Sequence, residues 1–236
     1  MGTRTALLLV ATLLISIPAG AVVQAEEYQE FWLWSGVKPT PAMRNAQVVY
    51  LHQGEIVSRH GQAVFERMGL PVSRLTFPQI WLTVRITTLD VPETLWPRIM
   101  QLLQLWAKKG NIVIGLQIDF DASTYRLDEY GQFLGHLRTL LPAEYALGVT
   151  GLLDWAKTGS IATLNTLPID ELIVQSYQGR KTVPNYSAYL PSLSRLAIPW
   201  KIGVVQNGEW DNQQESRLWT SPWFRGAVVF MLNPRR

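Results

Sequence analysis

The sequence predicts an α/β fold, a compact (β/α)8 barrel of the TIM type, and three observations support this. Eight short segments rich in β-branched and aromatic residues follow one another along the chain. Helical patterns lie between most of them, which indicates parallel strands joined by crossover helices. Several segments, including residues 112–114 and 227–230, are almost continuously apolar, as in strands covered on both faces. An open doubly wound sheet is the alternative, although its glycine-rich nucleotide-binding patterns are absent.

The eight strand segments set the expected order of elements. They are residues 31–34, 47–52, 80–87, 112–120, 145–151, 172–177, 201–205 and 226–232. The clearest helix is predicted over residues 92–109, because apolar residues recur there at helical spacing between Pro92 and Gly110. Residues 127–141 repeat this pattern up to a proline. Weaker helical patterns cover residues 154–164, 186–196 and 212–219, and the proline-bearing connection 35–44 predicts a stunted first helix.

The first 25 residues have the pattern of a secretory signal. Arg4 precedes an apolar run from Ala6 to Ile17, and an A-x-A-like site ends at Ala25. The run is shorter than a membrane span, and no other segment approaches that length. We therefore expect residues 1–25 to be a signal peptide and residues 26–236 a single barrel domain, periplasmic or secreted. A retained N-terminal anchor is the alternative.

The composition excludes several function classes. The chain has no cysteine, which rules out disulfides, cysteine-ligated zinc and cysteine nucleophiles. Its net charge of +3 comes from scattered basic residues, so we expect no nucleic-acid partner. Ten tryptophans suit a packed core and also a sugar-binding cleft, so a glycan is the expected partner. We expect no cofactor, and the sequence leaves the oligomeric state open.

The end of the fourth strand segment carries the main candidate site. Strand alternation places Gln117, Asp119 and Asp121 on one face, where three polar groups would be costly in a dry core. Two carboxyls so close do not ionise equally, so one pKa should rise. The result is a candidate general acid beside an ionised stabiliser. The alternative is that the aspartates cap the following helix or hold a loop.

Other strand ends supply further candidates, because functional groups of such barrels gather at the C-terminal ends of the strands. The catalytic candidates are Asp119, Asp121 and Tyr177, and the candidates for substrate binding are Trp34, Gln117, Asp154, Trp155, Gln175 and Glu209. Glu209 could complete a two-carboxyl glycosidase pair, although a solvated loop charge is the preferred interpretation. Three of the aspartates, at 119, 121 and 154, could hold a hard cation, but simple cleft acidity is preferred. No metal site is therefore expected.

Four segments carry a resemblance to a known family. They are Trp32-x-Trp34, residues 50–54 (YLHQG), residues 117–122 (QIDFDA) and residues 148–155 (GVTGLLDW). They resemble the bacterial family catalogued as domain of unknown function 3142. The resemblance covers most of the chain after residue 25 and implies a glycoside hydrolase-like barrel, while that family's activity is not established.

The fourth strand is also similar to the chitinase-type signature. On that resemblance Asp119 and Asp121 match the acidic pair, but Ser123 stands where those enzymes carry the catalytic glutamate. Tyr177 matches the tyrosine of their Met-x-Tyr-Asp segment, and Gln178 replaces its aspartate. Two hypotheses follow: an exported glycoside hydrolase-like barrel acting on or binding a glycan, or a non-catalytic glycan-binding or envelope interaction protein on a degenerate hydrolase barrel.

Overall fold

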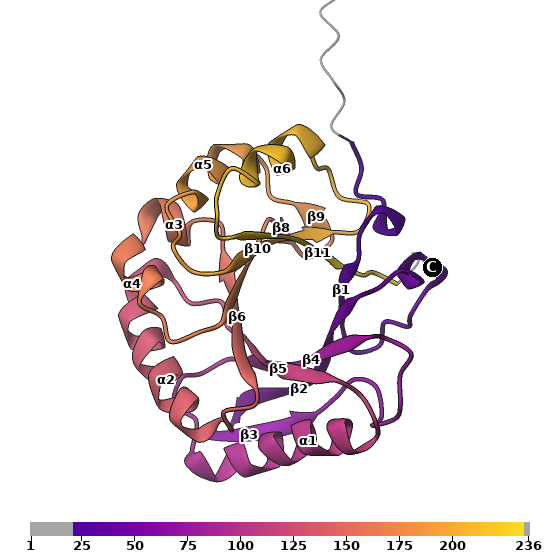
Figure 1. The fold of residues 1–236 in the computed structure, drawn as a ribbon. Coiled ribbons are helices and arrows are strands. Elements are labelled where there is room, and N and C mark those ends of the chain that lie inside the picture. The colour runs from indigo at the N-terminus through magenta and orange to yellow at the C-terminus, as the bar shows by residue number, and fades with distance from the viewer. Residues whose placement is uncertain (1–20, 234–236) are drawn as a thin grey trace, which may run out of the picture.

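The computed structural model describes residues 21–233, which form a closed barrel of parallel strands (Figure 1). The barrel strands are β1 (Glu30–Leu33), β2 (Val48–Arg59), β4 (Gln79–Ile86), β5 (Val113–Asp119), β6 (Ala146–Leu152), β7 (Glu171–Gln175), β10 (Trp200–Val205) and β11 (Phe224–Phe230). Strand β1 pairs in parallel with both β11 and β2, which closes the barrel. The predicted TIM-like barrel is confirmed, and each predicted strand segment overlaps one of these strands.

Helices pack around the outside of the barrel (Figure 1). The helices are α1 (Trp96–Lys108), α2 (Leu127–Leu140), α3 (Trp155–Thr158), α4 (Ile161–Asn165), α5 (Leu190–Leu193) and α6 (Asn212–Leu218). In α1 the predicted apolar stripe is buried, including Ile99, Leu103 and Trp106. The predicted helix over residues 154–164 is split into α3 and α4. Gly159 follows α3 in an extended conformation, and a side chain there would collide with Trp155 and Leu127.

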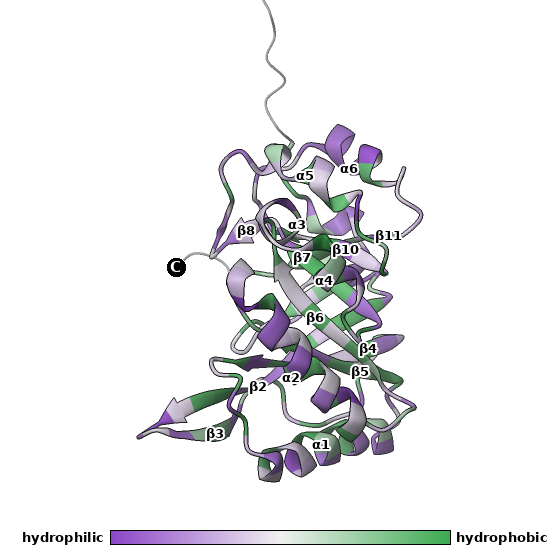
Figure 2. Ribbon diagram, turned by 90° about the vertical axis from the view of Figure 1, so that its left-hand side faces the viewer, coloured by the Kyte–Doolittle hydropathy of each residue, from purple (hydrophilic) through white to green (hydrophobic). Residues whose placement is uncertain are grey.

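The connections after β1 and β2 are not helical. The predicted stunted first helix is a single 3₁₀ turn, Pro41–Met43. Strand β2 runs past the barrel and pairs antiparallel with β3 (Gln62–Arg67), forming a hairpin that projects from the body (Figure 2). The sequence pattern ended this strand at His52. The strand continues through a β-bulge between His52 and Gly54, which changes the face that later residues present.

The barrel interior is filled by layers of side chains, so it is a core and not a channel. The middle layer is an apolar cluster made of Trp32, Tyr50, Trp81, Ile173 and Val228. At the N-terminal ends of the strands, Lys201 forms ion pairs with Glu30 and Glu171. The Tyr50 hydroxyl donates to Glu171 across 2.6 Å. These two layers fill the barrel from the N-terminal ends of the strands to its middle. Polar residues above them, at the C-terminal ends of the strands, therefore face an opening.

Most of the predicted signal segment lies outside the described residues. Val23 and Ala25 are described and buried, and the Val23 amide donates to the Gly208 carbonyl across 2.9 Å. In residues 21–233, no helix is both long and apolar enough to cross a membrane.

Candidate functional site

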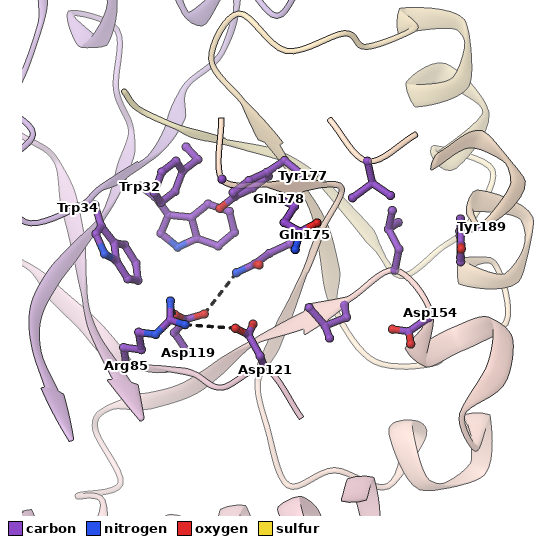
Figure 3. Close-up of a pocket in the computed structure, with 15 residues that line it drawn as sticks. Trp32, Trp34, Arg85, Asp119, Asp121, Asp154, Gln175, Tyr177, Gln178 and Tyr189 are labelled. Carbon is purple, nitrogen blue, oxygen red and sulfur yellow. Dashed lines mark hydrogen bonds and ion pairs between the residues drawn. The ribbon is translucent and has the colours of Figure 1, made fainter. Parts of the chain in front are cut away.

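A pocket of about 660 Å³ opens at the C-terminal ends of the barrel strands (Figure 3). Such a position is where barrels of this type carry their ligands. Its apolar walls include four aromatic side chains, Trp32, Trp34, Tyr177 and Phe230, and its polar groups include Arg85, Asp119, Asp121, Asp154 and Gln175. The pocket therefore combines flat rings with a small set of hydrogen-bonding and charged groups.

Asp119 forms part of the pocket floor. It is the last residue of β5, and only 3% of its surface is exposed. The Thr150 hydroxyl donates to its Oδ1 across 2.7 Å, and the Gln175 amide donates to the same atom across 3.3 Å. Burial raises the pKa of Asp119 because the charged form loses its hydration, while these donors and Arg85 offset only part of the rise. Asp119 can therefore hold a proton above the usual range of an aspartic acid.

Arg85 connects Asp119 with the second predicted acid. Its guanidinium nitrogens lie 3.6 Å from Asp119 Oδ2 and 3.2 Å from Asp121 Oδ2 (Figure 3). Asp121 follows the end of β5, and 52% of its side chain is exposed. The predicted convergence of the two acids is thus present: one carboxyl is buried and one is open, and both face the same cation.

Gln117 lies beneath the pocket and does not line it. Its Oε1 accepts hydrogen bonds from Trp32 Nε1 at 2.7 Å and from the Thr83 hydroxyl at 2.9 Å. The side chain is fully buried. It fixes the indole of Trp32, which does line the pocket. Strand alternation correctly predicts that the Gln117 side chain points into the barrel. Gln117 lies one layer below Asp119, however.

The aromatic walls come from the two ends of the chain and from the segment after β7. Tyr177 packs against Trp32 and Phe230, with ring centroids 6.3 and 5.1 Å apart respectively. Trp34 stacks on His52. Burial raises the pKa of the Tyr177 hydroxyl well above its ordinary value, so this group stays protonated at neutral pH. Tyr177 can therefore donate a hydrogen bond to a ligand but cannot easily act as a base.

The structure brings together only part of the predicted binding set. Asp154 lines the pocket from the segment after β6, on a different side from Asp119 (Figure 3). Trp155 is buried in the core, where its Nε1 donates to the Ala122 carbonyl across 2.7 Å. Glu209 is not among the lining residues, and its backbone carbonyl accepts a bond from Thr182. Trp155 thus braces the loop after β5, and Glu209 does not join the two aspartates in lining the pocket.

Arg85 is the functional candidate that sequence reasoning missed. It interrupts a strand that is otherwise mostly apolar, two and four residues after Thr83 and Trp81. Strand alternation places all three on the inner face. The available signal was a charged residue at an inward position of a mostly apolar strand.

The grouping of the acidic side chains also indicates whether they could bind a metal ion at this site. Across residues 21–233, no three His, Asp or Glu side chains are grouped so that they could hold a metal ion. Asp119, Asp121 and Asp154 therefore do not form a cation cage. Asp119 and Asp121 face Arg85, and all three aspartates line the pocket.

These features define a TIM-like barrel with an acidic, aromatic-walled pocket at its C-terminal mouth. The chain belongs to the family described as a domain of unknown function (DUF3142), which matches residues 74–196, just over half of the chain. The matched part includes Arg85, Asp119, Asp121 and Tyr177, and confirms the family resemblance. No curated protein matches the sequence.

One solved structure is partly similar to this chain. The Bacillus cereus spore cortex-lytic enzyme SleL superposes with a TM-score of 0.47 and 13% sequence identity, over 75% of this chain and 50% of that one. The chain thus spans about half the length of that enzyme. The likeness concerns the barrel architecture alone.

Proposed function

We propose that this protein is an exported barrel that binds a glycan in the pocket and hydrolyses a glycosidic bond with Asp119 and Asp121. The observation that carries the proposal is the pairing of a buried carboxyl of raised pKa with an exposed one, below aromatic walls. Glycoside hydrolysis needs two carboxyls with different protonation states beside the bond that is cleaved. Their different environments supply this difference.

The two acids take different roles in the proposed reaction. Asp119, which holds a proton at higher pH, donates it to the glycosidic oxygen as the bond to the anomeric carbon breaks. The Asp121 carboxyl faces the positive charge that develops on the sugar and stabilises it. Water then adds to the anomeric carbon, and the proton it releases returns to Asp119. Gln175 and Tyr177 provide donors that can orient sugar hydroxyls or a carbonyl oxygen.

The pocket walls favour a sugar over a flat or strongly charged ligand. A pyranose ring presents an apolar face of C–H groups and an edge of hydroxyls. Trp34 and Phe230 offer surfaces for the face, and the side chains of Gln175 and Asp154 offer partners for the edge. This combination supports a glycan as the ligand.

A second candidate function, glycan binding without hydrolysis, is favoured by the position of Arg85. Its guanidinium pairs with both carboxyls, and its charge opposes the rise in the pKa of Asp119, which disfavours proton donation by this group. The two hypotheses share the ligand class and differ in whether a product forms.

Screening the full chain against cell-wall and exopolysaccharide oligosaccharides tests both candidates. Binding is followed by calorimetry and cleavage by mass spectrometry of the sugars. Hydrolysis predicts products that are lost in D119N and D121N but retained in D128N, a matched change at an exposed aspartate outside the pocket. Binding that depends on Trp34, without product after long incubation, selects the non-catalytic candidate. No binding to any glycan in either assay refutes both.

Export is the part of the proposal that rests on residues 1–25. Expression of the full chain in a bacterial host, followed by fractionation and N-terminal sequencing, tests it. The expected result is a periplasmic or secreted product that starts at Glu26. Retention in the cytoplasm with the N-terminus intact contradicts export and leaves the proposed activity of the pocket unaffected.

A further inference from the structure

Trp34 and His52 form a face-to-face stack at the edge of the pocket. Their ring centroids lie 4.0 Å apart, and their planes differ by only 6°. Trp34 lines the pocket, whereas His52 is fully buried and does not. One indole ring thus forms a pocket wall while the imidazole ring supports it.

The imidazole is itself fixed by neighbouring groups. The Ser35 hydroxyl lies 2.6 Å from His52 Nδ1, within hydrogen-bond distance. The backbone of β2 is constrained on the other side, because Gly69 packs directly against the His52 carbonyl and has a φ of 79°. A residue with a side chain at position 69 would collide there. His52 therefore has little freedom to change rotamer.

Two charged groups face His52, Glu55 from its own strand and Arg85 from the neighbouring strand. Glu55, beyond the β-bulge on β2, lies 3.7 Å from Nε2, and Arg85 is on β4, paired in register with Glu55. Burial and the charge of Arg85 lower the pKa of His52 to about 4, so the ring is neutral at neutral pH. In the neutral ring Nδ1 can accept a hydrogen bond from the Ser35 hydroxyl, while Nε2 has no hydrogen-bond partner among the described residues.

We propose that His52 is a positioning residue, which holds the Trp34 indole as a fixed wall of the pocket so that a sugar ring can stack on it. The glycan does not touch His52. The inference relies on the proposed function for the identity of the ligand, while the stack itself can be tested without a ligand. The expected consequence is that binding is sensitive to a residue outside the pocket lining.

Three variants test the separate contributions of the His52 ring, its nitrogen atoms and the Ser35 hydroxyl. H52A removes the supporting ring, H52F keeps a flat ring without nitrogen atoms, and S35A removes the hydroxyl partner. H136A is the matched control, because His136 is an exposed histidine on α2 that lies outside this pocket. Thermal unfolding by circular dichroism identifies which variants fold.

The first measurement needs no ligand. We expect the indole N–H resonance of Trp34, assigned by its loss in W34F, to broaden or move in H52A. In H52F and H136A it should stay close to its wild-type position. A Trp34 resonance unchanged in folded H52A overturns the proposal, whatever the protein binds.

The second measurement uses the oligosaccharide found by screening. An aromatic pair of this kind corresponds to about a three- to tenfold change in affinity. We expect H52A to weaken binding by that factor, H52F to restore most of it, and H136A to leave it unchanged. Equal weakening in H52A and H52F overturns the positioning role. If no glycan binds even to the wild-type protein, the proposed function fails, and the resonance of Trp34 still decides the role of His52.

Discussion

Arg85 and Asp121 lie 3.2 Å apart at the mouth of the barrel, and the same guanidinium also faces Asp119 and His52. A single cation thus affects three titratable groups at once. The charge of Arg85 lowers the pKa of His52 and opposes the rise in the pKa of Asp119. Removing it should move both values upward.

The first prediction concerns R85Q and the titration of His52. The wild-type ring should titrate near pH 4, and R85Q should shift the midpoint toward the ordinary histidine value, because the repulsion with the imidazolium is gone. The chain has only three histidines, so their ring resonances can be followed individually by NMR. R85K retains the charge and should move the midpoint less. An identical midpoint in R85Q and wild type contradicts this electrostatic coupling.

The second prediction concerns the pH dependence of stability through Asp119. Its pKa is raised in the folded protein, so above the ordinary aspartate value of 3.8 the unfolded chain loses this proton first. The contribution of the group to stability therefore falls as pH rises toward the folded pKa. In D119N the side chain at position 119 does not titrate, so this pH-dependent loss of stability is absent. The melting temperature of D119N minus that of wild type should increase with pH across this window, by about 3–6 °C per pH unit.

Melting curves at several pH values between 3.5 and 8 check this prediction. D128N, at an exposed aspartate outside the pocket, provides the baseline. A difference for D119N that falls with increasing pH would mean that the folded protein prefers the ionised carboxyl, and Asp119 would then be unsuited to donate a proton.

Much of the site follows from local sequence geometry, and the rest depends on distant contacts. Alternation along β5 places Gln117 and Asp119 inside the barrel, because the period of a strand is set by its own backbone. The orientation of His52 depends instead on a bulge that accommodates Phe65 of another strand. A local pattern carries no information about that partner. For the same reason the hairpin of β2 and β3 was not predicted.

The third prediction contrasts Trp34 with Trp155, which the sequence analysis grouped together because both lie near predicted strand ends. Trp155 is buried and braces the Ala122 carbonyl, whereas Trp34 lines the pocket. W155A should lower the free energy of unfolding by about 3–5 kcal/mol, as for other large core truncations. W34A should lower it by less than about 1.5 kcal/mol and weaken glycan binding. Urea unfolding and calorimetry of the two variants measure both effects, and comparable stability losses would contradict the assigned positions.

The fourth prediction concerns the buried ion cluster at the closed end of the barrel. K201M leaves Glu30 and Glu171 without their cation, and the loss of one partner from a buried pair costs about 3–5 kcal/mol. Burial already raises the pKa of Glu30, and Lys201 is a group that opposes this rise. Without the lysine Glu30 should take up a proton more readily, so the deficit of K201M relative to wild type should shrink from pH 7 to pH 5.

Urea unfolding at the two pH values measures this deficit, with K109M as the control at an exposed lysine of the α1 end. Neutralising all three members in E30Q/E171Q/K201M should recover part of the stability, because no unpaired charge is then left in the barrel. The pocket lies at the opposite ends of the strands, so glycan affinity should be the same in folded K201M and wild type. A deficit that grows on acidification would show that the carboxyls remain ionised without Lys201, and that hydration, not the lysine, compensates their charge.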